Sequence, residues 1–218
     1  MQIAHPSCPI TAIVYPSGFK FEPILLELAT TMAEQGMRLA GLVQRSQPKP
    51  GRVKCDMFLQ DLATGELRAI SDDRGPHARG CVLNPDLLLR ACEAAQAGLS
   101  AQTDLLVLCK FGKTEAEGGG FRSLIANALE LSVPVLIGVP LINLSPFREF
   151  SAGLAQEIEL SQLVSDPLAV AERLRSSNWP LWKMVAVVER IRGWHNFAPG
   201  GVSTDSLEEG VLIHSTGA

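Results

Sequence analysis

Residues 104–122 read DLLVLCKFGKTEAEGGGFR, and this stretch decides the fold class of the chain. Its first part, Asp104 to Cys109, is the most apolar strand candidate and is typical of a strand buried on both faces. A glycine run then opens a helix predicted over Gly118 to Leu131, and Pro134 to Val139 predicts another buried strand. Strand, helix and strand in this order indicate an α/β domain with a mostly parallel sheet.

The segments before this stretch repeat the same alternation. Ile10 to Tyr15 is a β-branched run that ends at a Pro-Ser-Gly turn, and it predicts a buried strand. Apolar residues recur at helical spacing from Glu22 to Gln35, and Arg38 to Val43 predicts a second strand. Gln44 to Gly51 holds two prolines, a glycine and cations, so we expect a loop there.

A β-hairpin interrupts the alternation. Lys54 to Leu62 and Glu66 to Ser71 flank the turn residues Ala63-Thr64-Gly65, which is the pattern of two antiparallel strands. Asn84-Pro85-Asp86 then supplies a helix cap, a first-turn proline and an early acid for a helix that reaches Gly98. The predicted fold is therefore a three-layer α/β domain with an inserted hairpin.

The C-terminal third predicts helices and then a segment with little pattern. Ser145-Pro146 starts a short helix to Leu154, and Asp166-Pro167 starts a longer one to about Ser176. Trp179 to Arg192 has helical periodicity, whereas the residues after it are rich in Gly, Ser and Thr. We expect one domain over residues 1–176, followed by a C-terminal helix and flexible tail over residues 177–218.

Composition excludes several classes of protein. The 218 residues are 46% hydrophobic and 19% charged, which is typical of a globular domain. The net charge of −4 gives no general attraction to nucleic acid or to anionic membranes. The N-terminus lacks the pattern of a signal peptide, and no segment approaches the roughly 18 apolar residues of a membrane span. We expect a cytoplasmic protein that binds neither nucleic acid nor membrane.

Several motifs carry a family resemblance. Ala40 to Gln44, the hairpin region, and the run LLVLCKFGKTE at Leu105 to Glu115 resemble the THEP-type P-loop nucleoside triphosphatases. The runs CDM, ARGC and KFGKTEAEGGG, which start at Cys55, Ala78 and Lys110, are similar to a bacterial family of unknown function that is often encoded near molybdate-transport genes. This resemblance covers about Ile10 to Glu157, and it implies a P-loop-like fold in a molybdate-related context.

The sequence departs from the P-loop pattern at the residues that handle ATP. A phosphate-binding loop needs several glycines, a lysine, and a Ser or Thr for Mg²⁺. Here only Gly18 remains, Lys20 is one position out of place, Phe21 stands where the lysine would be, and Glu22 replaces the hydroxyl. At the end of the strand that corresponds to Walker B, Cys109 and Lys110 replace the Asp linked to Mg²⁺ and the Glu that activates water. These degenerate Walker motifs predict binding without hydrolysis.

The candidate site is an anion site at the end of the Asp104 to Cys109 strand. Cations and helix-opening glycines at the carboxyl end of a parallel strand favour an anionic ligand, although a solvated charged loop has the same composition. Loops on either side of the hairpin could add further cations, or they could be solvated surface. The candidate ligand-binding residues are Lys110, Lys113, Glu115, Gly118, Gly119, Gly120, Arg122, Arg45, Arg52, Arg79, Gly18 and Lys20.

Catalytic and metal-binding groups are weakly indicated. Glu115 could orient the lysines or act as an acid or base, but no nucleophile lies beside it in the sequence. Cys55, Cys81 and Cys109 border the candidate loops and could hold a soft metal, yet buried cysteines that act as small hydrophobes are commoner. No catalytic residue, cofactor or metal site is therefore assigned.

Three classes of function remain open. The first is a regulatory protein that binds a small anion, such as a nucleotide or molybdate, without turning it over. The second is an enzyme that still uses a nucleoside triphosphate. The third is a protein-interaction module with a vestigial pocket, for which the C-terminal Trp179, Trp182 and Trp194 would supply the docking residues.

Overall fold

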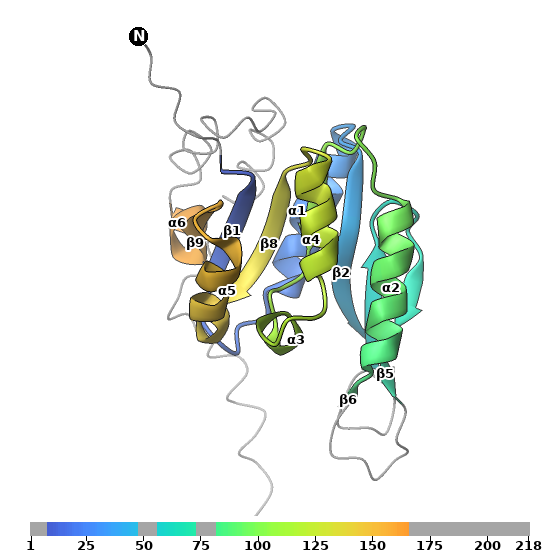
Figure 1. Ribbon diagram of the computed structural model, residues 1–218, viewed down its shortest axis with the longest axis horizontal. Helices are drawn as coiled ribbons and strands as arrows, with labels where there is room; N and C mark the ends of the chain where they lie inside the picture. The colour runs from blue at the N-terminus through green and yellow to red at the C-terminus, as the bar shows by residue number, and fades with distance from the viewer. Residues whose placement is uncertain (1–7, 48–55, 73–81, 166–218) are drawn as a thin grey trace, which may run out of the picture.

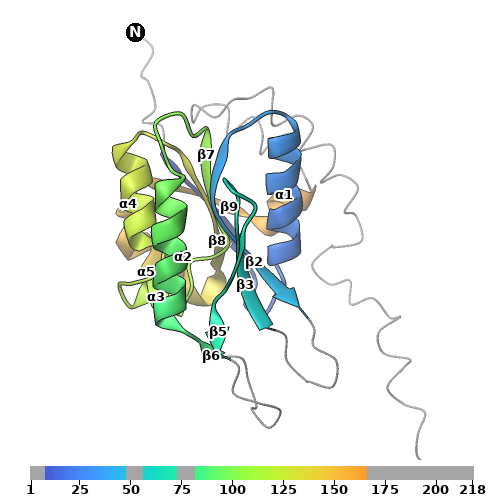
Figure 2. The same ribbon diagram turned by 90° about the vertical axis from the view of Figure 1, so that its right-hand side faces the viewer.

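The protein is an α/β sandwich of three layers around one central sheet (Figure 1). The computed structural model describes residues 8–47, 56–72 and 82–165. Helix α1 covers one face of the sheet, and helices α2 and α4 cover the other (Figure 2). The predicted fold class is thereby confirmed, and the division between residues 1–176 and 177–218 falls largely outside the described residues.

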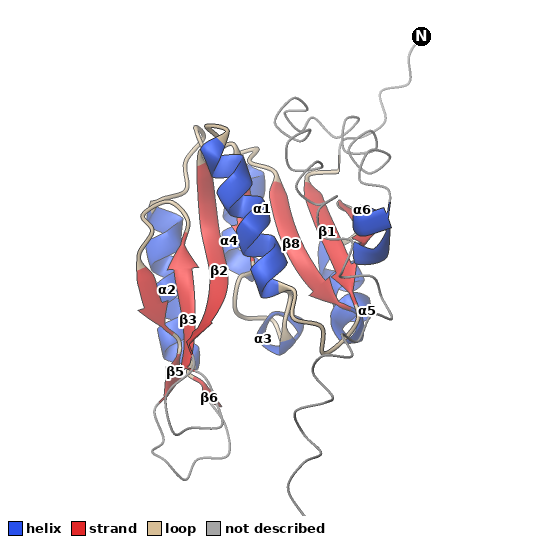
Figure 3. Ribbon diagram, turned by 180° about the vertical axis from the view of Figure 1, so that it is seen from behind, coloured by secondary structure: helices blue, strands red, loops and turns tan. Residues whose placement is uncertain are grey.

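The main sheet has seven strands in the order β4-β3-β2-β7-β8-β1-β9. The five strands from β2 to β9 in this order are mutually parallel, whereas β3 pairs antiparallel with both β2 and β4 (Figure 3). A separate two-stranded sheet joins β5 to β6. The strands are β1 (Ile10–Tyr15), β2 (Leu39–Gln47), β3 (Asp56–Asp61), β4 (Leu67–Ala69), β5 (Ser71–Asp72), β6 (Val82–Leu83), β7 (Leu105–Leu108), β8 (Val135–Pro140) and β9 (Ala155–Glu159).

Most of the helices connect these strands. They are α1 (Glu22–Glu34), α2 (Pro85–Ala97), α3 (Lys113–Ala116), α4 (Arg122–Glu130), the 3₁₀ helix η1 (Leu141–Asn143), α5 (Leu144–Ser151) and α6 (Leu160–Ser165). The side chain of Asn84 accepts hydrogen bonds from the amides of Asp86 and Leu87, so it caps α2 as the sequence predicts. The helices α1 and α2 end within a residue of their predicted positions.

The core is continuous through both faces of the sheet. All four residues of β7 are fully buried, which explains why this strand is an uninterrupted apolar run. Because β1, β7 and β8 are parallel, the segments that follow them emerge at one edge of the sheet. This edge brings the segment after Tyr15 close to the segment after Leu108.

Three sequence expectations are wrong. Residues 44–47 continue β2 instead of forming a loop, because they pair with β3 in the register that ends at Gln47 opposite Asp56. The helix expected from Gly118 begins at Arg122, since the positive φ angles of Gly118 (102°) and Gly120 (60°) are incompatible with a helix. The helix expected to reach Leu154 ends at Ser151, where Ala152 adopts a left-handed conformation.

The strand β9 and helix α6 were not expected. Residues 155–159 read AQEIE and lack the apolar run of the central strands, because β9 lies at the edge of the sheet and pairs with β1 alone. The predicted hairpin is confirmed as β3 and β4, and its strands are shorter than expected. The helices expected after Ser165 lie outside the described residues.

Candidate functional site

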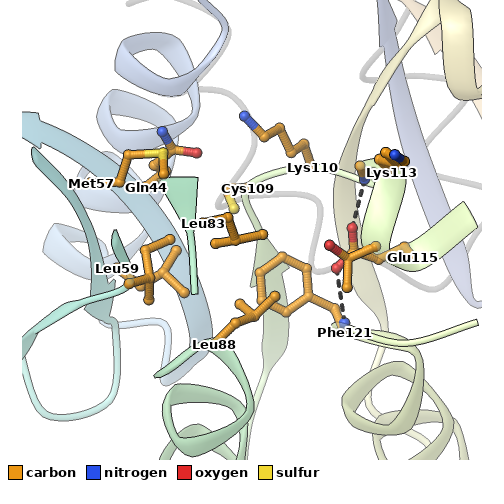
Figure 4. A pocket seen from close by; sticks show the side chains of 13 residues that line it. Gln44, Met57, Leu59, Leu83, Leu88, Cys109, Lys110, Lys113, Glu115 and Phe121 are labelled. Atoms are coloured by element: carbon orange, nitrogen blue, oxygen red, sulfur yellow. Dashed lines mark hydrogen bonds between the residues drawn. The ribbon is translucent and has the colours of Figure 1, made fainter. Parts of the chain in front are cut away.

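A cavity of about 220 Å³ lies beyond the carboxyl end of β7, between the β2–β3 pair and α3 (Figure 4). Its walls are mostly apolar, and polar groups approach it from the segment after β7. The lining residues are Gln44, Met57, Leu59, Ile70, Leu83, Leu88, Cys109, Lys110, Gly112, Lys113, Thr114, Glu115 and Phe121. The cavity therefore combines a hydrophobic interior with a cationic border.

Lys110 borders the cavity and forms an ion pair with the first residue of α1. Its Nζ lies 3.3 Å from Oε1 of Glu22, and the two side chains are 38% and 25% exposed. By the sequence resemblance, these are two of the positions that would hold Mg²⁺ and activate water in a P-loop enzyme. Here the ammonium of Lys110 and the carboxylate of Glu22 form an ion pair that is partly exposed to solvent.

The segment after β1 places an aromatic side chain in the core at the start of α1. Phe21 is completely buried, stacks on Tyr15 at a centroid distance of 4.7 Å, and leaves no room for a side chain at Gly138 on β8. Gly18 has a positive φ of 86° and open space where a Cβ would stand, and Lys20 is exposed to solvent. Pro23 removes one backbone amide from the first turn of α1. An aromatic ring therefore fills the volume where a lysine would otherwise start.

Glu115 is a buried carboxylate that holds the turn after α3 together. It is 3% exposed, Oε2 accepts a hydrogen bond of 2.7 Å from the Gly112 amide, and Oε1 accepts one of 3.1 Å from the Phe121 amide. Burial raises the pKa of this carboxyl above its usual value, although the amide hydrogen bonds oppose the shift. Both bonds support a structural role, and Glu115 also lines the cavity.

The glycine run makes room for this carboxylate. A Cβ on Gly120 would overlap Oε1 of Glu115, so glycine is required there for packing as well as for its positive φ. Gly118 has open space around it, and Gly119 lies beside Thr114. None of the three lines the cavity.

Arg122 is occupied by contacts within the domain. Its Nε donates a hydrogen bond of 2.6 Å to the Glu115 carbonyl oxygen, and its guanidinium lies 4.8 Å from the centroid of the Phe150 ring. Arg45 lies on β2 and donates from Nε to Oε1 of Gln60 on β3. Neither arginine lines the cavity.

Lys113 is the more exposed of the two cavity lysines. Its side chain is 86% exposed and pairs at 3.5 Å with Glu117, one turn along. An ion pair this open to water contributes little and leaves the lysine available to a ligand. The structure therefore brings Lys110, Lys113 and Glu115 together at the cavity.

Cys109 forms part of the cavity wall as a neutral thiol. It is buried, and burial raises its pKa to about 12, so it is protonated at neutral pH. Arg52, Arg79, Cys55 and Cys81 lie outside the described residues. Among the residues that the structure does describe, no cluster of three potential metal ligands occurs, and no helix is long and apolar enough to cross a membrane.

Comparison with known proteins gives the family. Residues 10–165 match a family described as "Protein of unknown function (DUF2478)". The chain belongs to this family. The match begins at the residue where the sequence resemblance begins, and it extends past Glu157 to the end of α6.

One protein sequence and one solved structure are similar to this DUF2478 chain. One is the "Molybdenum import ATP-binding protein ModC 2" of Bradyrhizobium diazoefficiens, which is 30% identical over 145 residues, or 66% of this chain. The chain spans 16% of that protein's length. The other is the crystal structure of THEP1 from Aquifex aeolicus, at 16% identity and a TM-score of 0.48, with coverage of 78% of this chain and 99% of that one.

Sequence reasoning on this DUF2478 chain missed the apolar wall of the cavity. Leu88 was expected only as a core residue of α2, and Met57, Leu59 and Leu83 belong to short strands. Their alternation and helical spacing indicate burial, but the same pattern describes residues packed against protein and residues packed around a cavity. The only available signal is the number of apolar residues in the segments around the cationic run. That number does not show which of these side chains face the cavity.

Proposed function

We propose that this chain is a regulatory domain that binds a small anion or nucleotide and does not hydrolyse nucleoside triphosphates. The proposed ligand-binding groups are Lys110 and Lys113, at the carboxyl end of a central parallel strand, where α/β sheets commonly bind ligands. The observation that carries the proposal is the position of Lys110, which lines the cavity and whose partly exposed ion pair with Glu22 leaves its ammonium open to exchange with an anion.

A link to molybdate or to ATP is part of this proposal. Its support is the relative named as a molybdenum import ATP-binding protein, with which the chain shares 30% identity over 145 residues. The matched part covers 16% of that protein, so the shared unit is proposed to be a sensing or regulatory module within it. ATP is an anion, and molybdate, an oxyanion of molybdenum, is one as well.

A thermal-shift screen tests the proposal. The protein is heated with ATP, ADP, GTP, molybdate, tungstate, sulfate or phosphate, each at two ionic strengths. A ligand present at about 100 times its Kd adds about 2.7 kcal/mol of stability, which gives a clear shift in Tm. A specific anion should still raise Tm at the higher salt concentration.

Matched variants locate the site. Lys110→Ala and Lys113→Ala should reduce the shift caused by the best anion, whereas Arg90→Ala on the exposed side of α2 should not. Equal losses in all three variants would mean diffuse attraction and would contradict the site. A screen without any shift would favour an interaction module, and magnesium-dependent turnover would favour a residual enzyme.

A further inference from the structure

The cavity is divided into an apolar end and a cationic end. Figure 4 shows Leu83, Leu88 and the ring of Phe121 together at one end, while the ammonium group of Lys110 extends at the other. Leu88 and Phe121 are buried, so their apolar surfaces are held in place by the core. A ligand that fills this space must present apolar surface and charge at different ends.

The volume limits the size of the apolar group. An apolar cavity of about 150 Å³ accepts benzene, and pockets for drug-sized molecules start near about 300 Å³. At about 220 Å³ the cavity fits a ring system of one or two fused rings. A nucleotide would place only its base within this volume, and a bare tetrahedral oxyanion would leave the apolar walls unfilled.

Charge sets the orientation. Lys110 attracts an acidic group, whereas the carboxylate of Glu115 repels an acid placed beside it. Glu115 uses one acceptor position on each oxygen for the amides of Gly112 and Phe121. A carboxylate has about four such positions, so it can accept one further hydrogen bond from a ring N–H or O–H.

We propose that this cavity binds a small ring compound that carries an acidic group, with the ring between Leu83, Leu88 and Phe121 and the acid at Lys110. The proposal rests on the proposed function, because it names the class of anion that the same site takes. This proposal differs from the proposed function because it requires the ligand to carry an apolar ring. The anion competes with Glu22 for the Lys110 ammonium, so ligand binding weakens the contact between the segment after β7 and the start of α1.

Three probes separate the contributions of ring and charge. They are 2-naphthoate, which has both features, 2-naphthalenemethanol, which has the ring without the charge, and acetate, which has the charge without the ring. Each is titrated into the ¹⁵N-labelled full chain and followed by amide chemical shifts. We expect 2-naphthoate to bind at least about tenfold more tightly than the other two probes, with shifts at Gly112 and Leu88.

Variants connect the binding to the two ends of the cavity. Lys110→Met should abolish the preference for 2-naphthoate over the alcohol, while Arg90→Met should leave it unchanged. Leu83→Phe fills the apolar end and should weaken both ring probes about tenfold. If Leu83→Phe does not give a folded spectrum, Met57→Phe on the opposite wall makes the same test.

The outcomes separate this inference from the proposed function. If 2-naphthoate binds no better than acetate, or if the filling variants leave its Kd unchanged, the ring proposal is wrong. Should molybdate or phosphate then bind in a Lys110-dependent manner, the proposed anion-binding function stands without the ring. If no probe, oxyanion or nucleotide binds, both proposals fail.

Discussion

Glu115 shows how a single buried residue organises the candidate site. Its carboxylate accepts hydrogen bonds from the amides of Gly112 and Phe121 and so ties both ends of a ten-residue segment. Burial raises the pKa of this carboxyl, which means that the folded protein retains the proton more strongly than the unfolded chain. The stability of the segment that borders the cavity should therefore depend on pH, because Glu115 holds this segment in place.

This coupling predicts a pH dependence of stability. For an acid whose folded pKa is raised, the stabilising contribution is complete below the unfolded pKa, near 4.5, and is lost as the pH rises through the folded pKa. The advantage of the wild type over Glu115→Gln in the free energy of unfolding should therefore fall as pH rises from about 4. Urea unfolding across pH measures it, and Glu117→Gln reports the general effect of removing one exposed charge. An advantage that grows with pH would contradict the assignment.

Gly120 predicts a second residue-scale effect. Alanine at this position would overlap Oε1 of Glu115, whereas alanine at Gly118 meets open space, and both glycines have positive φ. The φ of Gly118 lies farther from the left-handed region near 57° than that of Gly120, so backbone strain alone would make Gly118→Ala the costlier change. If Gly120→Ala nevertheless lowers the free energy of unfolding by about 1–3 kcal/mol more than Gly118→Ala, the excess reports the overlap with Glu115. Urea unfolding measures both. In a double variant with Glu115→Ala, the excess cost should largely disappear, and full additivity would count against the packing argument.

At the scale of elements, the pair Lys110–Glu22 joins the segment after β7 to the start of α1. The pair is half exposed, so its contribution to stability is small, about 0–1 kcal/mol. We expect the pair to affect ligand affinity more than it affects stability, because any anion at Lys110 competes with the Glu22 carboxylate. The Lys110–Glu22 contact is therefore expected to change the affinity of the site for anions more than the free energy of unfolding.

Glu22→Gln should tighten binding of an anion that has been identified by screening. Removing the competing carboxylate is expected to lower Kd about three- to tenfold, which corresponds to about 0.6–1.4 kcal/mol, while Tm changes little. The affinity is measured by calorimetric titration. Glu117→Gln, which frees the exposed Lys113, is the matched control and should give a smaller change. A weaker affinity in Glu22→Gln would mean that Glu22 itself contacts the ligand.

At the scale of the whole molecule, the buried Phe21 and the paired Lys110 lie at the two segments that the sequence resemblance aligns with the ATP-binding motifs of P-loop enzymes. Phe21 fills the core between β1 and β8, and Glu22 is occupied by Lys110. We predict no magnesium-dependent release of phosphate from ATP or GTP above the buffer rate, as measured with purified protein. Sustained turnover that co-purifies with the protein and is lost in Lys110→Ala would overturn this prediction.

Much of the fold could be predicted from the sequence, because its signals are local. The apolar run at Leu105–Leu108, the cap at Asn84 and the turn at Ala63-Thr64-Gly65 each specify an element without reference to distant residues. The strand β9 could not be predicted in this way, since an edge strand has no required apolar pattern. The extension of β2 to Gln47 also depends on a partner, because β3 supplies its pairing.

The sequence by itself determined the alternation of the central strands and helices, the mostly parallel sheet and the inserted hairpin. It also placed Lys110 and Lys113 after a central strand. Only the tertiary structure decided which of the candidate residues meet. It turned Arg122 toward Phe150 and Arg45 toward Gln60, and it paired Lys110 with Glu22, which is 88 residues away. A cavity is enclosed by side chains from separate elements, so its volume and its apolar wall arise from packing that no local pattern encodes.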